Sequence, residues 1–304
     1  KQEVYIRNFF IGELSGIYGM VFPFGDHLYF LVTHVNDRFL YRLPESWLIN
    51  ESSKAKETRM FIENIDELPE LVLSELKPFT FISSGSSHTC SLDEENTPIC
   101  WGDNGKNQLG TLLEKDTTPH PATVNVSGVL KGKKINVIRT WGNHVCAVAD
   151  DDKVYCWGDG SYWKLGKGSP ENSLFPVYVK YDGVLKDKKI VDVAPGGEHT
   201  CAIDKDGKVY CWGRNVYGQV GNETEQQWAV EPVEVDMSDV LNEREIIKIS
   251  CGSGHTCAVD KLGEIFCWGL NSRGQLGDGN GGDPGGIPGF PDHSMFPVRI
   301  ETGT

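Results

Sequence analysis

The sequence predicts an all-β fold assembled from repeated small antiparallel sheets. Three observations support this expectation: a strict internal repeat, glycine at the predicted turns, and pairs of cysteines at a fixed spacing. Glycine accounts for 35 of the 304 residues. Because glycine is costly inside helices and useful in turns, this composition favours many short strands joined by tight turns. Hydrophobic residues make up 39% of the chain, which is enough to bury a core.

The repeat consists of a histidine, two cysteines, a Trp-Gly pair and a closing glycine, and it occurs four times. The histidine precedes the first cysteine by two positions, the cysteines are ten apart, and the closing glycine follows the tryptophan by nine. The first cysteine recurs after 56, 55 and 56 residues. A fixed period of this kind marks a repeated structural unit. The repeated residues are His88, His144, His199 and His255, and Trp101, Trp157, Trp212 and Trp268.

Each repeat predicts a hairpin, then an outer strand, then the strand that opens the next unit. In the third repeat, residues 201–203 and 208–211 are β-prone and flank the turn 204–207, which ends in glycine. The later Pro-Val pair at 232–233 suits the start of an outer strand, where proline is tolerated. Residues 189–193 have the pattern of the opening strand.

These motifs, over roughly residues 80–300, resemble the regulator of chromosome condensation repeat. The resemblance implies a β-propeller, in which small antiparallel sheets surround a channel. We expect a single propeller domain over 1–304, with four clear repeats in 80–304 and a divergent N-terminal blade with an insertion in 1–79. Residues 3–11 are expected to supply a strand to the last blade. About five blades result, whereas the family typically has seven, so the ring is small, open, or a fragment of a seven-bladed ring.

The cysteine pairs depart from the nuclear form of this repeat and resemble its secreted members. Opposite positions of a hairpin lie close enough for a disulfide. Reduced, buried cysteines are one alternative; zinc is another, although zinc ligands usually lie two to four residues apart. Cys251 is left over and is expected to be a buried free thiol, with an intermolecular link as the alternative. The expected disulfides are Cys90–Cys100, Cys146–Cys156, Cys201–Cys211 and Cys257–Cys267.

Disulfides imply an oxidising compartment, so the chain is expected to be secreted or on the cell surface. Acceptor sequons for N-glycosylation begin at Asn50, Asn125 and Asn222, in agreement with a glycoprotein. The chain starts at Lys1 without an initiator methionine, which a removed signal peptide or a shortened chain would explain.

The formal net charge is −14, from 29 basic and 43 acidic residues. An acidic surface repels phosphate backbones and anionic lipids, which argues against nucleic acid as a partner and favours a basic protein. The alternative is that the charge serves solubility alone. No stretch approaches the roughly 20 apolar residues of a transmembrane helix, so membrane insertion is not expected.

Tyr162, Trp163 and Trp228 are the candidate contact residues, because they lie outside the Trp-Gly motif. Trp163 stands where the third repeat has Gly218. An aromatic side chain exposed on such a turn is typical of a contact hot spot; burial in the core is the alternative.

The repeated histidines are expected to maintain the geometry of each blade through hydrogen bonds to neighbouring main chain. A metal site or a pH-sensing site is the alternative.

The sequence contains no nucleophile elbow, phosphate loop or metalloprotease helix. We therefore expect no catalytic, cofactor-binding or metal-binding residues. The predicted function is that of an extracellular protein-binding scaffold that uses its propeller loops, and assembly with other chains is left open. One alternative is a channel-face enzyme or carbohydrate-binding propeller. Another is guanine-nucleotide exchange on a small GTPase, as in the founding family member. It is disfavoured because it requires a reducing nuclear setting.

Overall fold

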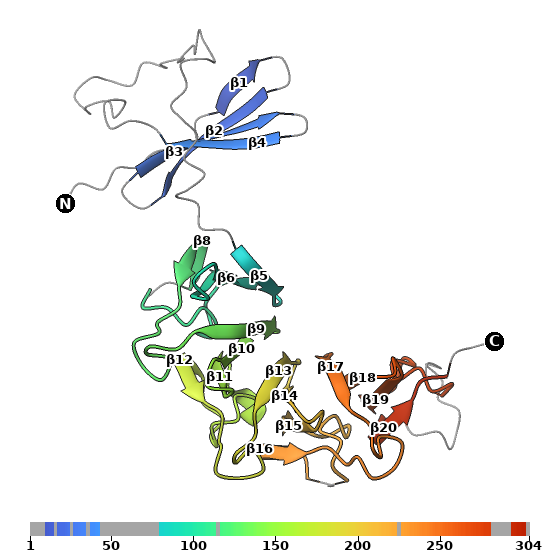
Figure 1. Ribbon diagram of the computed structural model, residues 1–304. Coiled ribbons are helices and arrows are strands. Elements are labelled where there is room, and N and C mark those ends of the chain that lie inside the picture. The colour runs from blue at the N-terminus through green and yellow to red at the C-terminus, as the bar shows by residue number, and fades with distance from the viewer. Residues whose placement is uncertain are drawn as a thin grey trace. The chain divides into compact units, whose positions relative to one another are not determined.

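The computed structural model describes residues 10–14, 17–24, 27–34, 37–42, 79–113, 116–223, 226–280 and 293–301 (Figure 1). The chain divides into two compact units, residues 1–77 and 78–304. In the described residues, β-strands form the sheets of both units, and a short 3₁₀ turn, η4 (Ser161–Trp163), lies in the second. Of these residues, none belongs to a helix long and apolar enough to cross a membrane.

The first unit contains one antiparallel sheet with the strands in chain order. Its strands are β1 (Phe10–Leu14), β2 (Ile17–Phe24), β3 (His27–His34) and β4 (Asp37–Arg42). β1 pairs with β2, β2 with β3 and β3 with β4, each antiparallel. Residues 3–9 of the segment expected to complete the last blade lie outside the described residues. That this sheet is a blade of the ring stays a prediction.

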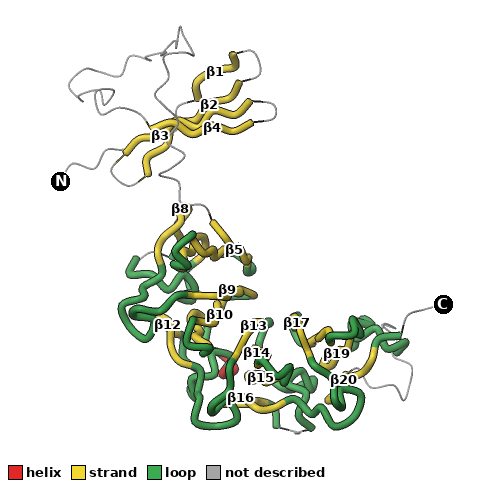
Figure 2. The backbone as a smooth tube through the Cα atoms, viewed as in Figure 1, coloured by secondary structure: helices red, strands yellow, loops and turns green. Residues whose placement is uncertain are grey.

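The second unit contains four antiparallel sheets of four strands each, which we call blades 1 to 4 (Figures 1 and 2). The strands of every blade lie in chain order, and the first strand precedes the repeated histidine. The bounds are β5 (Phe79–Ser84), β6 (His88–Asp93), β7 (Pro98–Asp103) and β8 (Thr117–Thr123) in blade 1; β9 (Ile135–Trp141), β10 (His144–Ala149), β11 (Val154–Gly158) and β12 (Ser173–Tyr178) in blade 2; β13 (Ile190–Pro195), β14 (His199–Asp204), β15 (Val209–Arg214) and β16 (Trp228–Glu234) in blade 3; and β17 (Ile246–Cys251), β18 (His255–Asp260), β19 (Ile265–Leu270) and β20 (His293–Arg299) in blade 4.

Blade 4 corrects the expectation that the N-terminal segment completes it. Its first strand, β17, comes from the chain just before His255, so all four strands are local in sequence. Phe10 and Ile11, which belong to the segment expected to join it, pair with β2 instead. The expectation was wrong because the unit was taken to start at the histidine, one strand too late.

In blades 1, 3 and 4, a side-chain carboxylate organises the turn between the second and third strands. In blade 3, Asp204 Oδ1 accepts hydrogen bonds from the main-chain N–H groups of Asp206 and Lys208. Asp260 does the same for Leu262 and Glu264 in blade 4. Aspartate can accept hydrogen bonds from the amides of the turn that follows it. The aspartate that ends the second strand therefore sets where the chain reverses.

Neighbouring blades meet where a tryptophan ring covers a glycine. A Cβ atom at Gly110 would lie 2.7 Å from Trp157 Nε1 of the next blade, and one at Gly166 would lie 2.8 Å from Trp212 Nε1. Only glycine therefore fits at the end of the motif. Trp157 and Trp212 are fully buried in these contacts, and burial of a large aromatic ring is a major apolar contribution to the core.

The repeated histidine joins the same junction through a threonine of the next blade. Between blades 2 and 3, His144 Nε2 lies 2.9 Å from Thr200 Oγ1. The Thr200 hydroxyl donates to the carbonyl of Lys164 at 2.8 Å, and Trp212 Nε1 donates to that same oxygen at 2.8 Å. Since Thr200 uses its hydrogen on the carbonyl, His144 is the donor in the first bond. The structural interpretation of the histidine agrees with this contact, but its partner is a hydroxyl rather than main chain.

Blades 3 and 4 repeat the arrangement, and blades 1 and 2 lack one member. His199 Nε2 lies 2.8 Å from Thr256 Oγ1, and Thr256 and Trp268 both donate to the carbonyl of Gln219. At the first junction, Val145 occupies the position of the threonine. His88 is consequently buried with neither ring nitrogen hydrogen-bonded within the described part of the chain.

All four expected disulfides are confirmed. Each joins directly opposite residues of the second and third strands, with Cα atoms 4.0–4.1 Å apart. Each pair is therefore closed within its own hairpin, which leaves no thiolates for zinc there. Cys251 is a buried free thiol, as expected, and burial raises its pKa to about 12.

Thiol titration tests this cysteine assignment. In the native protein we expect no rapid reaction with a thiol reagent, because the only unpaired sulfur, Cys251, is buried and protonated at neutral pH. Denaturation without reductant should release one thiol per chain, and denaturation with reductant should expose all nine cysteines. Three or more thiols in the unreduced, denatured chain would contradict the four bridges.

Val145→Thr should stabilise the junction of blades 1 and 2 by about 1 kcal/mol, the usual net value of a hydrogen bond. The hydroxyl can accept from His88 and donate to the carbonyl of Gln108, which already accepts from Trp157 Nε1. The measurement is the free energy of unfolding in urea. Val148→Thr is the control, because it buries a hydroxyl without such a network and should destabilise. Equal losses in the two variants would rule out the missing-bond explanation.

Acidification should weaken the folded state through the buried histidines. Burial lowers the pKa of His199 from 6.5 to about 3, so between about pH 6.5 and 3 the unfolded chain binds more protons than the folded one. The free energy of unfolding is therefore highest above about pH 6.5 and falls as the pH falls. At pH 5 the loss should be about 2 kcal/mol for this residue. Urea unfolding of His199→Gln should show a smaller difference between about pH 7 and 5; an unchanged difference would exclude His199 as the cause.

Candidate functional site

The three candidate contact residues lie together at the junction of blades 2 and 3. Trp228, at the start of β16, lies with its ring centroid 6.2 Å from Tyr162 and 5.8 Å from Trp163, both in η4. The Tyr162 and Trp228 rings are stacked, with 27° between their planes. All three side chains are half-buried. The structure thus brings together residues from two blades that are 65 positions apart in the sequence.

Arg214 connects this group of three rings to the ring of Tyr217. Its guanidinium lies 5.2 Å from the ring centroid of Tyr162 and 5.7 Å from that of Tyr217. Such contacts are favourable because the positive charge faces the electron-rich side of each ring. We call Tyr162, Trp163, Arg214, Tyr217 and Trp228 the aromatic cluster. Its members lie in η4, at the last residue of β15, in the loop after β15 and at the first residue of β16.

The backbone beneath the cluster is strained at two successive residues. Tyr162 has φ 61° and Trp163 has φ 58°. The second position is occupied by Gly218 in blade 3 and Gly274 in blade 4, both also at positive φ. A side chain other than glycine in the left-handed region costs on the order of 1 kcal/mol. The contacts of Tyr162, stacked, and Trp163, tilted, with the Trp228 ring act against this cost.

A lysine in place of the usual glutamine accounts for the altered turn. In blade 3, Gln219 Oε1 accepts a hydrogen bond from the main-chain N–H of Tyr217 at 2.9 Å. Lys164 occupies the equivalent position in blade 2 and has no acceptor atom. Its Nζ instead donates to Asp159 Oδ2 at 2.6 Å and to Ser161 Oγ at 3.3 Å. The turn consequently folds around the Lys164–Asp159 ion pair, and the three residues before the lysine form η4.

The charges next to the cluster are paired. Burial would raise the pKa of Asp159, but the hydrogen bond and charge of Lys164 outweigh it, and the pKa is lowered. Arg214 forms an ion pair with Glu198 in the loop between β13 and β14. The site therefore presents aromatic rings together with two ion pairs, Lys164–Asp159 and Arg214–Glu198.

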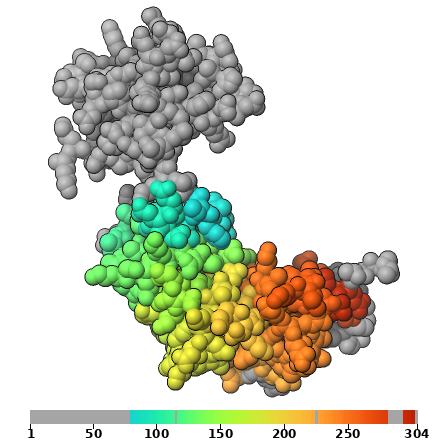
Figure 3. Space-filling view, in the orientation of Figure 1, coloured from blue at the N-terminus to red at the C-terminus, as the bar shows by residue number. Residues whose placement is uncertain are grey.

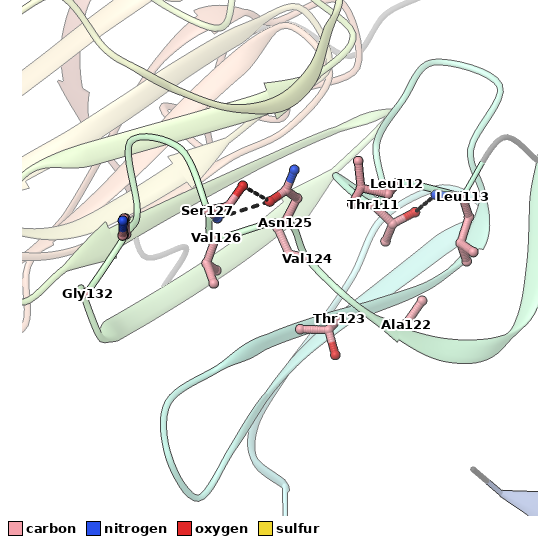
Figure 4. Close-up of a pocket in the computed structure, with 11 residues that line it drawn as sticks. Thr111, Leu112, Leu113, Ala122, Thr123, Val124, Asn125, Val126, Ser127 and Gly132 are labelled. Carbon is pink, nitrogen blue, oxygen red and sulfur yellow. Dashed lines mark hydrogen bonds between the residues drawn. The ribbon is translucent and has the colours of Figure 1, made fainter. Parts of the chain in front are cut away.

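A shallow hollow of about 560 Å³ lies on blade 1 (Figure 4). Its walls include Leu112, Leu113, Val124 and Val126, and Lys131 is the ionisable residue that lines it. Main-chain and side-chain hydrogen bonds fix its rim, for example from Leu113 N–H to Thr111 Oγ1.

The other candidate sites have different outcomes. Of the three glycosylation candidates, Asn125 and Asn222 are half-buried, and Asn50 lies outside the described residues. The side-chain oxygen of Asn125 accepts hydrogen bonds from the N–H and the hydroxyl of Ser127. Glycosylation stays a prediction.

Among the described residues, His199, Cys201 and Cys251 place potential metal-ligand atoms within 4.8 Å of one another. Cys201 is in a disulfide, so it cannot serve as a thiolate ligand.

Arg214 and Tyr217 were missed in the sequence analysis. Arg214 follows the Trp-Gly pair at the position of Asp103 in blade 1, and Tyr217 directly precedes the turn glycine. A comparison of the repeats position by position would have shown both as departures, as it showed Trp163. Their contact with Tyr162 depends on how two blades pack, which the spacing of motifs does not reveal.

Comparisons with known proteins identify the fold and the family. Residues 51–295 match the family described as RCC1-like domain. The ultraviolet-B receptor UVR8 of Arabidopsis thaliana is 31% identical over 204 residues, which are 66% of this chain and 43% of the receptor. The E3 ubiquitin-protein ligase HERC2 of Homo sapiens is 29% identical over 245 residues, 75% of this chain and 5% of the ligase. The chain therefore spans less than half the length of these two relatives.

Solved structures agree on the fold. Human WBSCR16 superposes with a TM-score of 0.63 and 22% identity, covering 91% of this chain and 65% of that one. Yeast RCC1 (Prp20), solved bound to Kap60, gives a TM-score of 0.61 with 18% identity, covering 95% of this chain and 60% of that one. These likenesses confirm the expected β-propeller architecture. The matched residues, 51–295, cover well over half of the sequence, and the chain belongs to the RCC1-like domain family.

Proposed function

We propose that this protein is an extracellular scaffold that binds a protein partner through the aromatic cluster and catalyses no reaction itself. The observation that carries the proposal is the pair of left-handed residues, Tyr162 and Trp163, whose rings both contact Trp228. Backbone strain that persists in a folded protein concentrates at binding sites and active sites. Half-buried tryptophan, tyrosine and arginine side chains are also the residue types that dominate contact hot spots.

The disulfides support the proposed location and the rigidity of the scaffold. Each hairpin is closed by its own bridge next to the interblade core, and stable disulfides are typical of oxidising compartments. A rigid support lowers the entropy lost when a partner binds, which leaves more of the contact energy as affinity.

The net charge of −14 favours a partner with a basic surface. Attraction between opposite charges accelerates association and weakens with salt, because ions screen exposed charges beyond about 8 Å at physiological ionic strength. We therefore expect this protein to contribute the rings of the aromatic cluster at the centre of the contact. Its acidic groups would attract basic groups of the partner at the edge of the contact.

The activities of the longer relatives are properties of those whole proteins. The matched part of HERC2 is 5% of that ligase, so ubiquitin transfer is not carried over to this chain. Guanine-nucleotide exchange remains the disfavoured alternative, because the likeness to the yeast RCC1 structures rests on 18–19% identity and indicates the fold alone.

Trp163→Gly tests the proposed contact site. Glycine occupies this position in blades 3 and 4, so the variant keeps the left-handed turn, loses its strain and lacks the ring. We expect the unfolding midpoint to change little. Affinity for a partner captured from the native source should fall about thirtyfold or more, the effect of losing a hot-spot residue worth about 2 kcal/mol.

Leu262→Ala is the matched control. Leu262 is apolar and 77% exposed, and it lies on the turn between β18 and β19 of blade 4, outside the aromatic cluster. It should leave affinity unchanged. The partner's association rate should also fall as salt rises. Full binding by Trp163→Gly, or equal losses in both variants, would refute the aromatic cluster as the contact site.

A further inference from the structure

The aromatic cluster lies between the two middle blades of the second unit. Its residues belong to blades 2 and 3, and Figure 3 shows these blades between the cyan end and the red end of that unit. Tyr162, Trp163, Tyr217 and Trp228 are half-buried, so a ligand can reach part of each ring. The charges and hydrogen-bonding groups around these rings therefore decide which class of partner segment fits.

The cluster already holds a cation of its own. The Arg214 guanidinium lies 5.2 Å from the ring centroid of Tyr162 and 5.7 Å from that of Tyr217, and its charge is balanced by the ion pair with Glu198. Aromatic rings attract cations through their electron-rich faces. A second cation brought to these two rings would meet the charge of Arg214 and be repelled. The segment that covers the rings is therefore uncharged.

The two indole N–H groups of the cluster are donors without partners. In the described part of the chain, neither Trp163 Nε1 nor Trp228 Nε1 forms a hydrogen bond, and neither is among the buried polar atoms left without one. Both N–H groups therefore face solvent, and an indole N–H can only donate. The carboxylates beside the rings are already paired, Asp159 with Lys164 and Glu198 with Arg214. The cluster thus offers donors and ring faces, while its carboxylate acceptors are occupied.

These properties favour a segment that carries acceptors and few donors. An ordinary peptide over the rings would bring main-chain N–H groups, and a donor buried without an acceptor costs more than a typical hydrogen bond returns. Proline has a carbonyl but no N–H. Proline-rich segments also form a preformed extended helix that docks on aromatic surfaces with little loss of entropy. Sugars fit less well, because each hydroxyl group is a donor as well as an acceptor.

We propose that the aromatic cluster binds a proline-rich segment of the partner. The prolines would cover the rings, and main-chain carbonyls of the segment would accept from Trp163 Nε1 and Trp228 Nε1. Basic residues beside the prolines would face acidic side chains, since Glu171 and Glu223 are exposed in the loops after β11 and β15. This inference rests on the proposed function, whose contact site it specifies.

Fluorescence anisotropy with a dye-labelled peptide tests the inference. The probe is oligoproline with arginines at both ends, and the reference peptide has the same length and charge, with alternating serine and glycine in place of proline. The full chain should bind the probe saturably and about tenfold more tightly than the reference. Trp163→Gly should weaken binding of the probe by about tenfold or more, and Leu262→Ala should not change it.

Trp228→Phe separates the hydrogen bond from the ring. Phenylalanine keeps an apolar ring at this position and removes the N–H. Affinity for the oligoproline probe should therefore fall about fivefold, the usual net effect of one hydrogen bond, while the unfolding midpoint stays near that of the unmodified chain. An unchanged affinity would overturn the hydrogen bond assigned to Trp228.

Three results would overturn the inference as a whole. They are no binding of the oligoproline probe, equal binding of probe and reference, and binding of chitohexaose or cellohexaose that Trp163→Gly abolishes, which would assign the site to a carbohydrate. The proposed function fails by a different result, full binding of the captured partner to Trp163→Gly. A partner that needs Trp163 but is not displaced by the oligoproline probe would overturn the inference and leave the proposed function standing.

Discussion

The second unit depends on one contact, in which a tryptophan ring of one blade lies on a glycine of the blade before it. The ring can approach because no Cβ atom is present: one at Gly221 would lie 2.8 Å from Trp268 Nε1. The indole N–H then reaches the carbonyl two residues earlier, that of Gln219. A large apolar surface and a buried donor are satisfied together, which a tryptophan in an apolar core requires. This geometry gives a physical reason for the fixed interval between Trp-Gly and the closing glycine.

Contacts within a hairpin could be predicted from the sequence, whereas contacts between blades could not. The pairing of Cys201 with Cys211 followed from two β-prone runs around a glycine turn, because residues so close in sequence have few ways to meet. The partner of the repeated histidine was predicted as main chain and proved to be Thr200, or its equivalent, 56 residues away. Spacing within a motif carries no information about the register of the next blade, so the hydroxyl partner could not be foreseen.

The candidate site shows the same division. Tyr162, Trp163 and Trp228 could be picked out because they interrupt a repeat, and the structure places them in one cluster. Arg214 was missed because its role depends on rings contributed by two loops. The number of blades in the ring was also left open, since four local repeats specify each sheet but do not specify what lies beyond the first and the last.

At the aromatic cluster, the side chain departs from the repeat while the main chain keeps it. At the cluster, Lys164 replaces a glutamine that accepts a main-chain hydrogen bond, and the turn rearranges while the carbonyl of Lys164 still receives Trp212 and Thr200. The side chain changed, but the main-chain atom that joins the blades did not. A loop can thus vary its exposed residues without loss of the interblade contact, because that contact uses a carbonyl that every residue has. The atoms that join the blades are therefore different from the side chains that the loops expose. A binding scaffold needs this property, because loop side chains can change while the packing of the blades is kept.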